Sequence, residues 1–267
     1  MNRMDAALHG LNEMDALAGG RSPVHRWNPA VKLAVTVLYI LLTVSFDKYD
    51  LAGIVPMVLY PVIMYQLSGI SVGLCFYRLR FVLPLVAAVG LLNPFFDHTV
   101  IYEAGSITIT GGMVSLVTLM LKGVFCLMAS FLLAATTHFD ALCRALRKFH
   151  VPKMMVTLLL LTYRYARVLT EEASVMTDAY HLRAPGQKGI HYRAWGSFLG
   201  QLLLRSFDRA QELYNSMLLR GFEGELRYIQ EPPCGKKDLL WLGVSVIILV
   251  FLRFYGISQL LGNLVLR

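Results

Sequence analysis

Hydrophobic residues in this chain of 267 residues gather into five long runs separated by polar segments. The runs are Pro29–Phe46, Leu51–Gln66, Phe81–Phe96, Met113–Ala135 and Leu239–Tyr255. A helix needs about 17–25 mainly apolar residues to cross a bilayer, so each run is a candidate membrane span, the shorter ones near the lower limit. Pro56, Pro61 and Pro84 lie inside the second and third runs and predict kinks, which neighbouring helices must cover.

Residues 137–237 follow a different pattern, in which apolar residues recur every three or four positions between charges. This spacing predicts three amphipathic helices. The first starts near Thr137, which with Asp140 has the spacing of a capping box. The second runs from Pro152 to Arg183. The third carries the stripe Leu199, Leu203, Phe207, Ala210, Tyr214 and Met217.

Charges keep the long second helix out of the hydrocarbon, because charged side chains are costly at the bilayer centre. The interrupting residues are Arg164, Arg167, Glu171, Glu172 and Asp178. We expect the two long helices to pack on each other along their stripes, beneath the membrane domain. Pro185-Gly186 stops the second helix, and Gly221 stops the third.

The pattern as a whole predicts an all-α membrane protein with about five transmembrane helices. A cytoplasmic coupling domain of three helices, two of them long, is inserted before the last span. The expected divisions are a cytoplasmic N-terminal segment at 1–28, spans one to four at 29–136, the coupling domain at 137–237, and the last span with the C-terminus at 238–267. Within the first segment, Met4, Leu8, Leu11 and Met14 share one helical face, a pattern of an amphipathic helix.

Composition and charge support this arrangement and orient it. The chain is 56% hydrophobic and 16% charged, with a mean hydropathy of +0.56 and a net charge of +8. Residues 138–237 hold 15 of the 25 Lys and Arg residues. The connection "DHTVIYEAGSITITGG" (97–112) holds none. Because positive loops stay in the cytoplasm, the N-terminus and the basic block are expected inside and the C-terminus outside.

Motifs for covalent chemistry are absent from the sequence. There is no G-x-x-x-x-G-K-[ST], G-x-S-x-G or H-E-x-x-H, so the chain is neither a P-loop ATPase nor a recognisable hydrolase. The four cysteines and seven histidines are scattered, which argues against a metal site or a disulfide framework. No nucleic-acid-binding motif accompanies the basic block. We therefore expect no catalytic, cofactor-binding or metal-binding residues.

Two arginines at helix ends are the candidate site residues. Arg183 precedes Ala184 at the end of one long helix, and Arg220 precedes Gly221 at the end of the other. Each arginine could simply favour the negative end of the helix dipole and cap carbonyls. Arginine also offers a rigid fork of donors for carboxylates on a partner protein, so two such ends would make two docking points.

Lys122 lies about ten residues into the fourth apolar run. A lysine at that depth marks a functional polar site by default. The alternative is a structural lysine that snorkels or faces a polar partner inside the bundle.

Several stretches resemble the transmembrane (T) component of energy-coupling factor (ECF) transporters, most closely the CbiQ branch. They are "DALAGGRSPVHRWNPAVKL" (15–33), "ATTHFDALCRALRKFHVP" (135–152), "LLLTYRYARVLTEEASVMTDAYHLRAPG" (159–186) and "LLLRSFDRAQELYNSMLLRGFEG" (202–224). In that family each coupling helix carries an Ala-Arg-Gly-like motif whose arginine docks on an ATPase subunit. By position the resemblance implies Arg183 and Arg220. Here the motifs read Leu182-Arg183-Ala184 and Leu219-Arg220-Gly221.

The resemblance implies a non-catalytic coupling subunit of an importer in the prokaryotic plasma membrane. Its partners would be two ABC-type ATPases, which bind ATP and Mg, and a CbiM-like membrane substrate-binding (S) component, with a small CbiN-like subunit. ATPase movement would pass through the paired helices to the S component. That component would hold the transported divalent metal, cobalt first and nickel next.

Two other classes compete with this interpretation. A conventional ABC importer permease forms its own translocation path, and "EEASVMTDAYHLRAPG" (171–186) is faintly similar to the coupling loop of such a permease. That permease would present one coupling element per chain, whereas this chain presents two. A multi-pass membrane enzyme would carry polar or metal-ligating clusters at the ends of its spans, and the sequence contains none.

Overall fold

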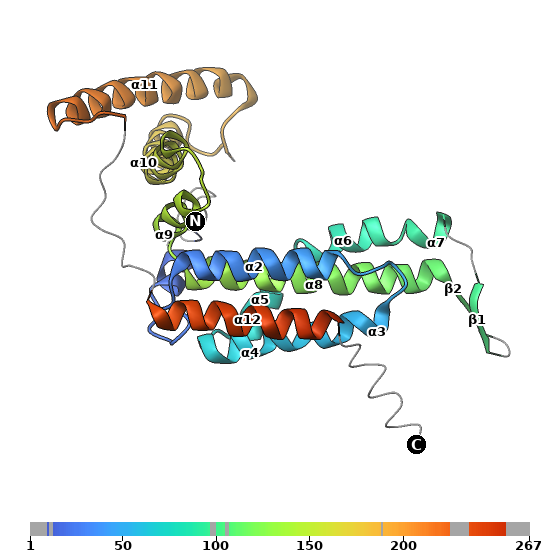
Figure 1. The fold of residues 1–267 in the computed structure, drawn as a ribbon. Helices are drawn as coiled ribbons and strands as arrows, with labels where there is room; N and C mark the ends of the chain where they lie inside the picture. The colour runs from blue at the N-terminus through green and yellow to red at the C-terminus, as the bar shows by residue number, and fades with distance from the viewer. Residues whose placement is uncertain are drawn as a thin grey trace. The chain divides into compact units, whose positions relative to one another are not determined.

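The structure is a computed structural model that describes residues 10, 13–96, 100–104, 107–187, 189–224 and 235–254 (Figure 1). The chain divides into two compact units. We call residues 18–137 with 232–267 the apolar unit, and residues 1–17 with 138–231 the amphipathic unit. The N-terminal pattern at Met4, Leu8 and Leu11 lies outside the described residues.

The apolar unit is built from helices and one short β-hairpin. Its elements are α2 (Pro29–Val44), α3 (Leu51–Ile54), η1 (Val55–Val58), α4 (Leu59–Ser68), α5 (Val72–Leu79), α6 (Leu83–Gly90), α7 (Asn93–Phe96), β1 (Val100–Ala104), β2 (Ile107–Thr110), α8 (Gly111–Thr136) and α12 (Lys236–Phe254). The antiparallel hairpin pairs Val100 with Thr110 and Ala104 with Ile107. It adds two strands, next to α8, to the expected helical fold.

Helix α8 is the central element of the apolar unit. It packs against α2 and against α3 to α7, while α12 packs on α2 (Figure 1). The core contains fully buried Tyr39, Ile54, Met57, Tyr65 and Leu249. The Tyr39 hydroxyl donates to the Met57 carbonyl at 3.1 Å, which satisfies a buried polar group.

By length and composition, two described helical stretches are suited to cross a membrane: Leu51–Ser68 and Gly111–Thr136. The bent pair Val72–Leu79 and Leu83–Gly90, which turns by 60°, makes a third when counted as one span. Helix α2 has 16 residues, just under the usual length. The 19 residues of α12 carry charges near both ends, including Lys236, Lys237 and Arg253.

Pro56 and Pro84 lie at irregular or first-turn positions, whereas Pro61 lies within α4 and does not interrupt it. Pro56 lies in the 3₁₀ segment η1, between α3 and α4. The expected third run, 81–96, is not one helix: α6 ends at Gly90 and α7 begins at Asn93. Pro84 stands in the first turn of α6, because it lacks the N–H that a helix interior needs.

The amphipathic unit contains α9 (Phe139–Lys148), α10 (Lys153–Arg183), η2 (Tyr192–Ala194) and α11 (Trp195–Leu219). Helices α9 and α10 pack around buried Cys143, Val156 and Leu160. The expected capping box at Thr137 does not form. His138 occupies the N-cap position of α9, without a side-chain cap.

Helices α10 and α11 cross rather than align, which corrects the expectation that they pack along matching stripes. Figure 1 shows α10 nearly along its axis, with α11 lying across it. Arg205 on α11 pairs with Glu172 on α10 at 2.6 Å. The stripe residues Leu199, Leu203 and Phe207 are 53–62% exposed. Crossed helices touch over a short length, so most of the α11 stripe stays uncovered.

Candidate docking site

The C-terminal end of α10 presents Arg183 and Leu182 to solvent. Arg183 is the last residue of the helix and is exposed, and Leu182 is 84% exposed. Ala184 takes the C-cap position, and its N–H donates to the Tyr180 carbonyl at 3.0 Å. Gly186 follows with a φ of 92°, a left-handed conformation that suits glycine and turns the chain away from the helix. The chain therefore leaves the helix directly after Arg183.

The end of α11 is a Schellman motif. Gly221 has a φ of 76°, its N–H donates to the Leu218 carbonyl, and the Phe222 N–H donates to the Met217 carbonyl, each at 3.0 Å. Arg220 is the exposed C-cap residue, and Leu219 before it is 90% exposed. Both long helices thus end in an exposed leucine followed by an exposed arginine.

Neither arginine caps its own helix through its side chain. Within the described part of the chain, the guanidinium groups of Arg183 and Arg220 have no hydrogen bond or ion pair. A guanidinium can donate five hydrogen bonds, and an exposed leucine can be buried by a partner. Each helix end is therefore able to bind a surface that combines carboxylates with an apolar patch. We call Leu182–Arg183 and Leu219–Arg220 the two docking ends.

The two docking ends lie on separate arms of the crossing. From Glu172 to Arg183 is roughly 16 Å along α10, and from Arg205 to Arg220 roughly 22 Å along α11, at 1.5 Å per residue. The ion pair between Glu172 and Arg205 marks the crossing. Two helix ends on two arms suit contact with two different surfaces.

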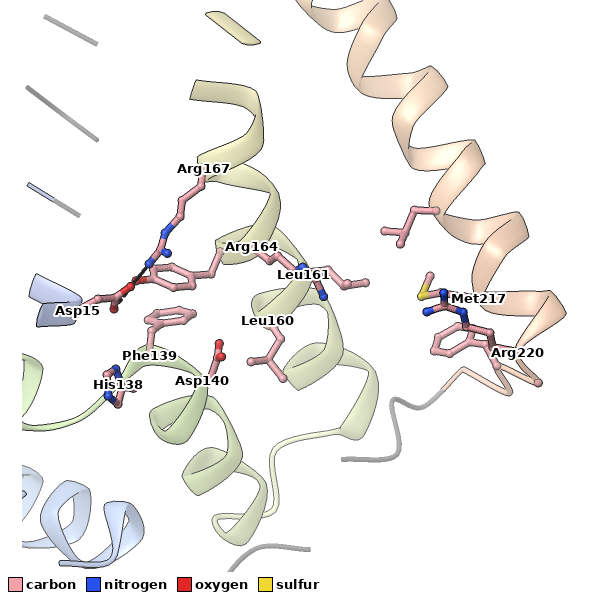
Figure 2. A pocket seen from close by; sticks show the side chains of 14 residues that line it. Asp15, His138, Phe139, Asp140, Leu160, Leu161, Arg164, Arg167, Met217 and Arg220 are labelled. Atoms are coloured by element: carbon pink, nitrogen blue, oxygen red, sulfur yellow. Dashed lines mark hydrogen bonds and ion pairs between the residues drawn. The ribbon is translucent and has the colours of Figure 1, made fainter. Parts of the chain in front are cut away.

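A groove of about 690 Å³ lies between the first half of α10 and the end of α11 (Figure 2). Leu160, Leu161 and Met217 give it apolar walls. Figure 2 shows the side chains of Arg164 and Arg220 reaching toward each other across it. Two cations facing one groove favour an acidic group of a partner at this end of α11.

The other side of the groove is fixed by a network around Tyr163. Its hydroxyl donates to Asp15 Oδ1 at 3.0 Å and accepts from Arg167 Nη2 at 3.2 Å, while Arg167 pairs with Asp15 (Figure 2). The Tyr163 ring stacks on Phe139 at 4.2 Å. Burial, and then the Asp140 carboxylate, raise the pKa of the Tyr163 hydroxyl, so it remains a donor. This network ties the N-terminal segment to α10.

Lys122, the predicted intramembrane polar residue, donates to the backbone at the end of α2. Its Nζ lies 3.2 Å from the Val44 carbonyl oxygen and also contacts that of Phe46. Arg253 joins the same turn, donating to the Ser45 carbonyl at 3.3 Å. The last carbonyls of a helix have no partner within it, so these cations satisfy them. The functional polar site at Lys122 stays a prediction.

Lys32 is a further buried cation, whose contacts the sequence analysis did not anticipate. It is 6% exposed, and its Nζ donates to the carbonyl of Thr136, the last residue of α8, at 2.8 Å. Its acceptor lies 104 positions away and is a backbone carbonyl, which no side-chain pattern reveals.

No described group of three or more His, Cys, Asp or Glu residues could hold a metal ion. Among the described cysteines, Cys75, Cys126 and Cys143 are free thiols. Burial, followed by the Asp140 carboxylate, raises the pKa of the Cys143 thiol to about 11.

Apolar helices long enough to cross a membrane, with two long helices that each end in an exposed arginine, indicate a membrane protein. Comparison with known families gives the assignment. The family model described as "Cobalt transport protein" (CbiQ) matches residues 20–231. The chain therefore belongs to the CbiQ family, among the transmembrane components of ECF transporters.

Named relatives agree with this assignment. The chain is 25% identical to the ECF transporter transmembrane protein EcfT of Bacillus subtilis over 88% of this chain and 94% of the relative. It is 33% identical to the cobalt transport protein CbiQ of Rhodobacter capsulatus over 41% of this chain and 46% of the relative. It is 30% identical to the nickel permease LarQ of Lactiplantibacillus plantarum over 45% of this chain and 44% of the relative.

Proposed function

We propose that this chain is the non-catalytic coupling subunit of an ATP-driven ECF importer. Its two docking ends bind two ABC-type ATPase subunits, where ATP and Mg are bound and ATP is hydrolysed. The observation that carries this proposal is the repeated exposed Leu-Arg pair at the ends of α10 and α11. A solvent-exposed leucine beside an arginine without a described partner suits a protein surface better than water.

The crossed helices suggest how movement is transmitted. When ATP binding or hydrolysis moves the ATPases, each docking end moves with the subunit that it holds. Helix α10 is 31 residues long and α11 is 25 residues long, so a shift at either end acts through a long rigid element. The movement then passes through the helices of the apolar unit to a separate S component.

The proposed topology has five spans in a prokaryotic plasma membrane, with α2 and α12 added to the three apolar stretches. The N-terminus and the domain at 137–237 face the cytoplasm, and the C-terminus lies outside. The charge distribution supports this orientation, because Lys and Arg concentrate in the segments placed inside. The tilt and depth of the 16-residue α2 would depend on its neighbours.

The proposed cargo is a divalent metal ion, cobalt first and nickel next, held by a CbiM-like S component with a CbiN-like subunit. The family description names cobalt, and one relative is named a nickel permease. The described residues hold no cluster able to ligate the ion, which supports placing its site on the partner.

Charge reversal at the docking ends tests the proposal. The chain is co-expressed with its ATPase and S subunits as wild type, Arg183→Glu, Arg220→Glu and the double variant. Co-purification of the ATPases and metal uptake in proteoliposomes are measured. We expect each single reversal to weaken ATPase binding or uncouple hydrolysis from uptake, because a carboxylate would replace the guanidinium opposite acidic groups.

Arg209→Glu is the matched control, since Arg209 is an exposed arginine within α11 and away from its end. This variant should retain ATPase binding and uptake. If the double variant assembles and transports normally, both arginines serve only to stabilise the ends of their helices, and the docking surface lies elsewhere.

A further inference from the structure

Among the described residues, three groups accept hydrogen bonds from the Lys32 ammonium, two of them at the end of α8, and none of the three is acidic. Its Nζ donates to the carbonyls of Thr136 at 2.8 Å and His25 at 3.2 Å, and to Thr137 Oγ1 at 3.4 Å. A buried ammonium without a counter-ion is costly unless hydrogen bonds and helix dipoles replace water. Here the negative end of the α8 dipole faces it.

Other contacts join α12 to the same place. The Asn28 N–H donates to Asp238 Oδ1 at 3.4 Å, and the Asn28 side chain caps the start of α2 through the Ala30 N–H at 3.0 Å. Trp27 and Trp241 lie with ring centroids 4.2 Å apart. We call His25, Asn28, Lys32, Thr136, Thr137 and Asp238 the junction cluster.

The junction cluster lies where the chain passes between the two units. The chain passes from one unit to the other between residues 17 and 18, between 137 and 138, and between 231 and 232. Thr136 and Thr137 are the last two residues before the second passage, and α9 begins at Phe139. Only Thr137 and His138 separate α8 from α9, so any displacement of α9 pulls directly on the final turn of α8.

That final turn is mechanically weak in isolation. The last four carbonyls of a helix lack partners within it, and helix ends fray readily. A pull on α9 would then unwind α8 instead of moving it. The Lys32 ammonium binds the last carbonyl of α8 and the side chain of the next residue, which holds this turn closed.

We propose that Lys32 is a positioning residue that fixes the end of α8, so that displacement of the amphipathic unit moves whole helices of the apolar unit. This inference rests on the proposed coupling function. Loss of Lys32 should therefore separate ATP hydrolysis from transport and leave the docking ends intact.

Lys122 provides a matched comparison on the same helix pair. Lys32 extends from α2 to the last carbonyl of α8, and Lys122 extends from α8 to the last carbonyl of α2. Both lysines cap a helix end through their ammonium groups. Only Lys32 lies beside a passage between the units, so a purely structural role predicts similar effects for both.

The test uses the complete transporter complex in proteoliposomes, with Lys32→Met, Lys122→Met and Thr137→Val. ATP hydrolysis and uptake of radioactive cobalt are measured together, and a melting temperature is recorded for each complex. We expect both lysine variants to lower the melting temperature. Uptake per ATP should fall about tenfold in Lys32→Met, which lies within the roughly 5–150-fold range that coupling between two sites usually spans. In Lys122→Met, uptake per ATP should stay near wild type.

Thr137→Val removes one acceptor of Lys32 with little change in side-chain shape, and should give a smaller fall in uptake per ATP. If Lys32→Met does not assemble, this milder variant decides. The inference would be overturned if uptake per ATP were unchanged in Lys32→Met, or in Thr137→Val where Lys32→Met does not assemble. An equal fall in Lys32→Met and Lys122→Met would also overturn it. If Arg183→Glu and Arg220→Glu still release the ATPases, the proposed function survives that result. A wild-type complex without ATP-driven uptake would overturn both.

Discussion

Each docking end combines an apolar residue with a directional cation. Leu182 and Leu219 are, with Tyr192, the most exposed large hydrophobic side chains among the described residues. Covering a leucine contributes affinity without fixing geometry, whereas an arginine fork fixes the position of the carboxylate that it meets. Under the proposed function, the pair would give a small helix end both affinity and a fixed geometry for its partner.

Truncation of the leucines tests this division of roles. We expect Leu182→Ala or Leu219→Ala to weaken ATPase binding roughly tenfold or more, since burying a leucine is worth about 1.5–3 kcal/mol. Stability should change by less than about 0.5 kcal/mol, because both side chains are exposed. Binding is measured by titration of purified ATPases, and stability by calorimetry. Val175→Ala, at a 65% exposed position within α10, is the control. If that variant weakened ATPase binding as much as the leucine variants, binding would not be confined to the two docking ends.

Cys143 tests the packing of α9 on α10. The pKa of its thiol is raised to about 11 and the side chain is 1% exposed, so little reactive thiolate exists near neutral pH. We expect alkylation of Cys143 to be slow at pH 8 in the folded chain and fast after denaturation. Between the ordinary pKa of 9.0 and about 11, the folded thiol keeps a proton that the unfolded thiol loses, so this group lowers stability as pH rises through that range. Mass spectrometry of single-cysteine chains measures the rates, and fast labelling of folded chain at pH 8 would contradict the packing.

At the scale of elements, the end of α11 depends on the left-handed conformation of Gly221. Gly221→Ala should lower stability by about 1–2 kcal/mol, because an L-residue is strained at that φ, and should fray the turn that holds Arg220. Gly200→Ala in the same helix should be neutral or stabilising, since Gly200 lies in the helix interior with open space around it. Thermal unfolding compares the two variants. Equal stability of both would argue against the Schellman end.

Sequence patterns predicted elements better than they predicted the contacts between them. The ends of α10 and α11 followed from Pro185-Gly186 and Gly221, because these residues act within a few positions of themselves. The break between α6 and α7 and the crossing of α10 with α11 did not follow. A stripe such as Leu199 and Leu203 shows that one face of a helix is apolar, but it does not show which other helix or protein packs against that face. The contacts of Lys32 were hidden because backbone carbonyls carry no residue identity.

At the scale of the whole molecule, two docking ends in one chain predict the composition of the complex. Native mass spectrometry should find one copy of this chain for each pair of ATPases. A conventional permease with one coupling element per chain would require two copies instead. Two copies per pair would therefore favour that alternative and remove the reason for assigning a separate ATPase to each end.

The two lysines that join α2 and α8 restrict how these helices can move. Each helix is held at its last carbonyl by an ammonium from the other, and the two contacts lie at opposite ends of α2. Sliding one helix along the other in either direction would stretch both contacts at once, whereas tilting the pair as one body stretches neither. The two contacts therefore fix the register of the pair, and of the two only the Lys32 contact lies where α8 leads directly into α9.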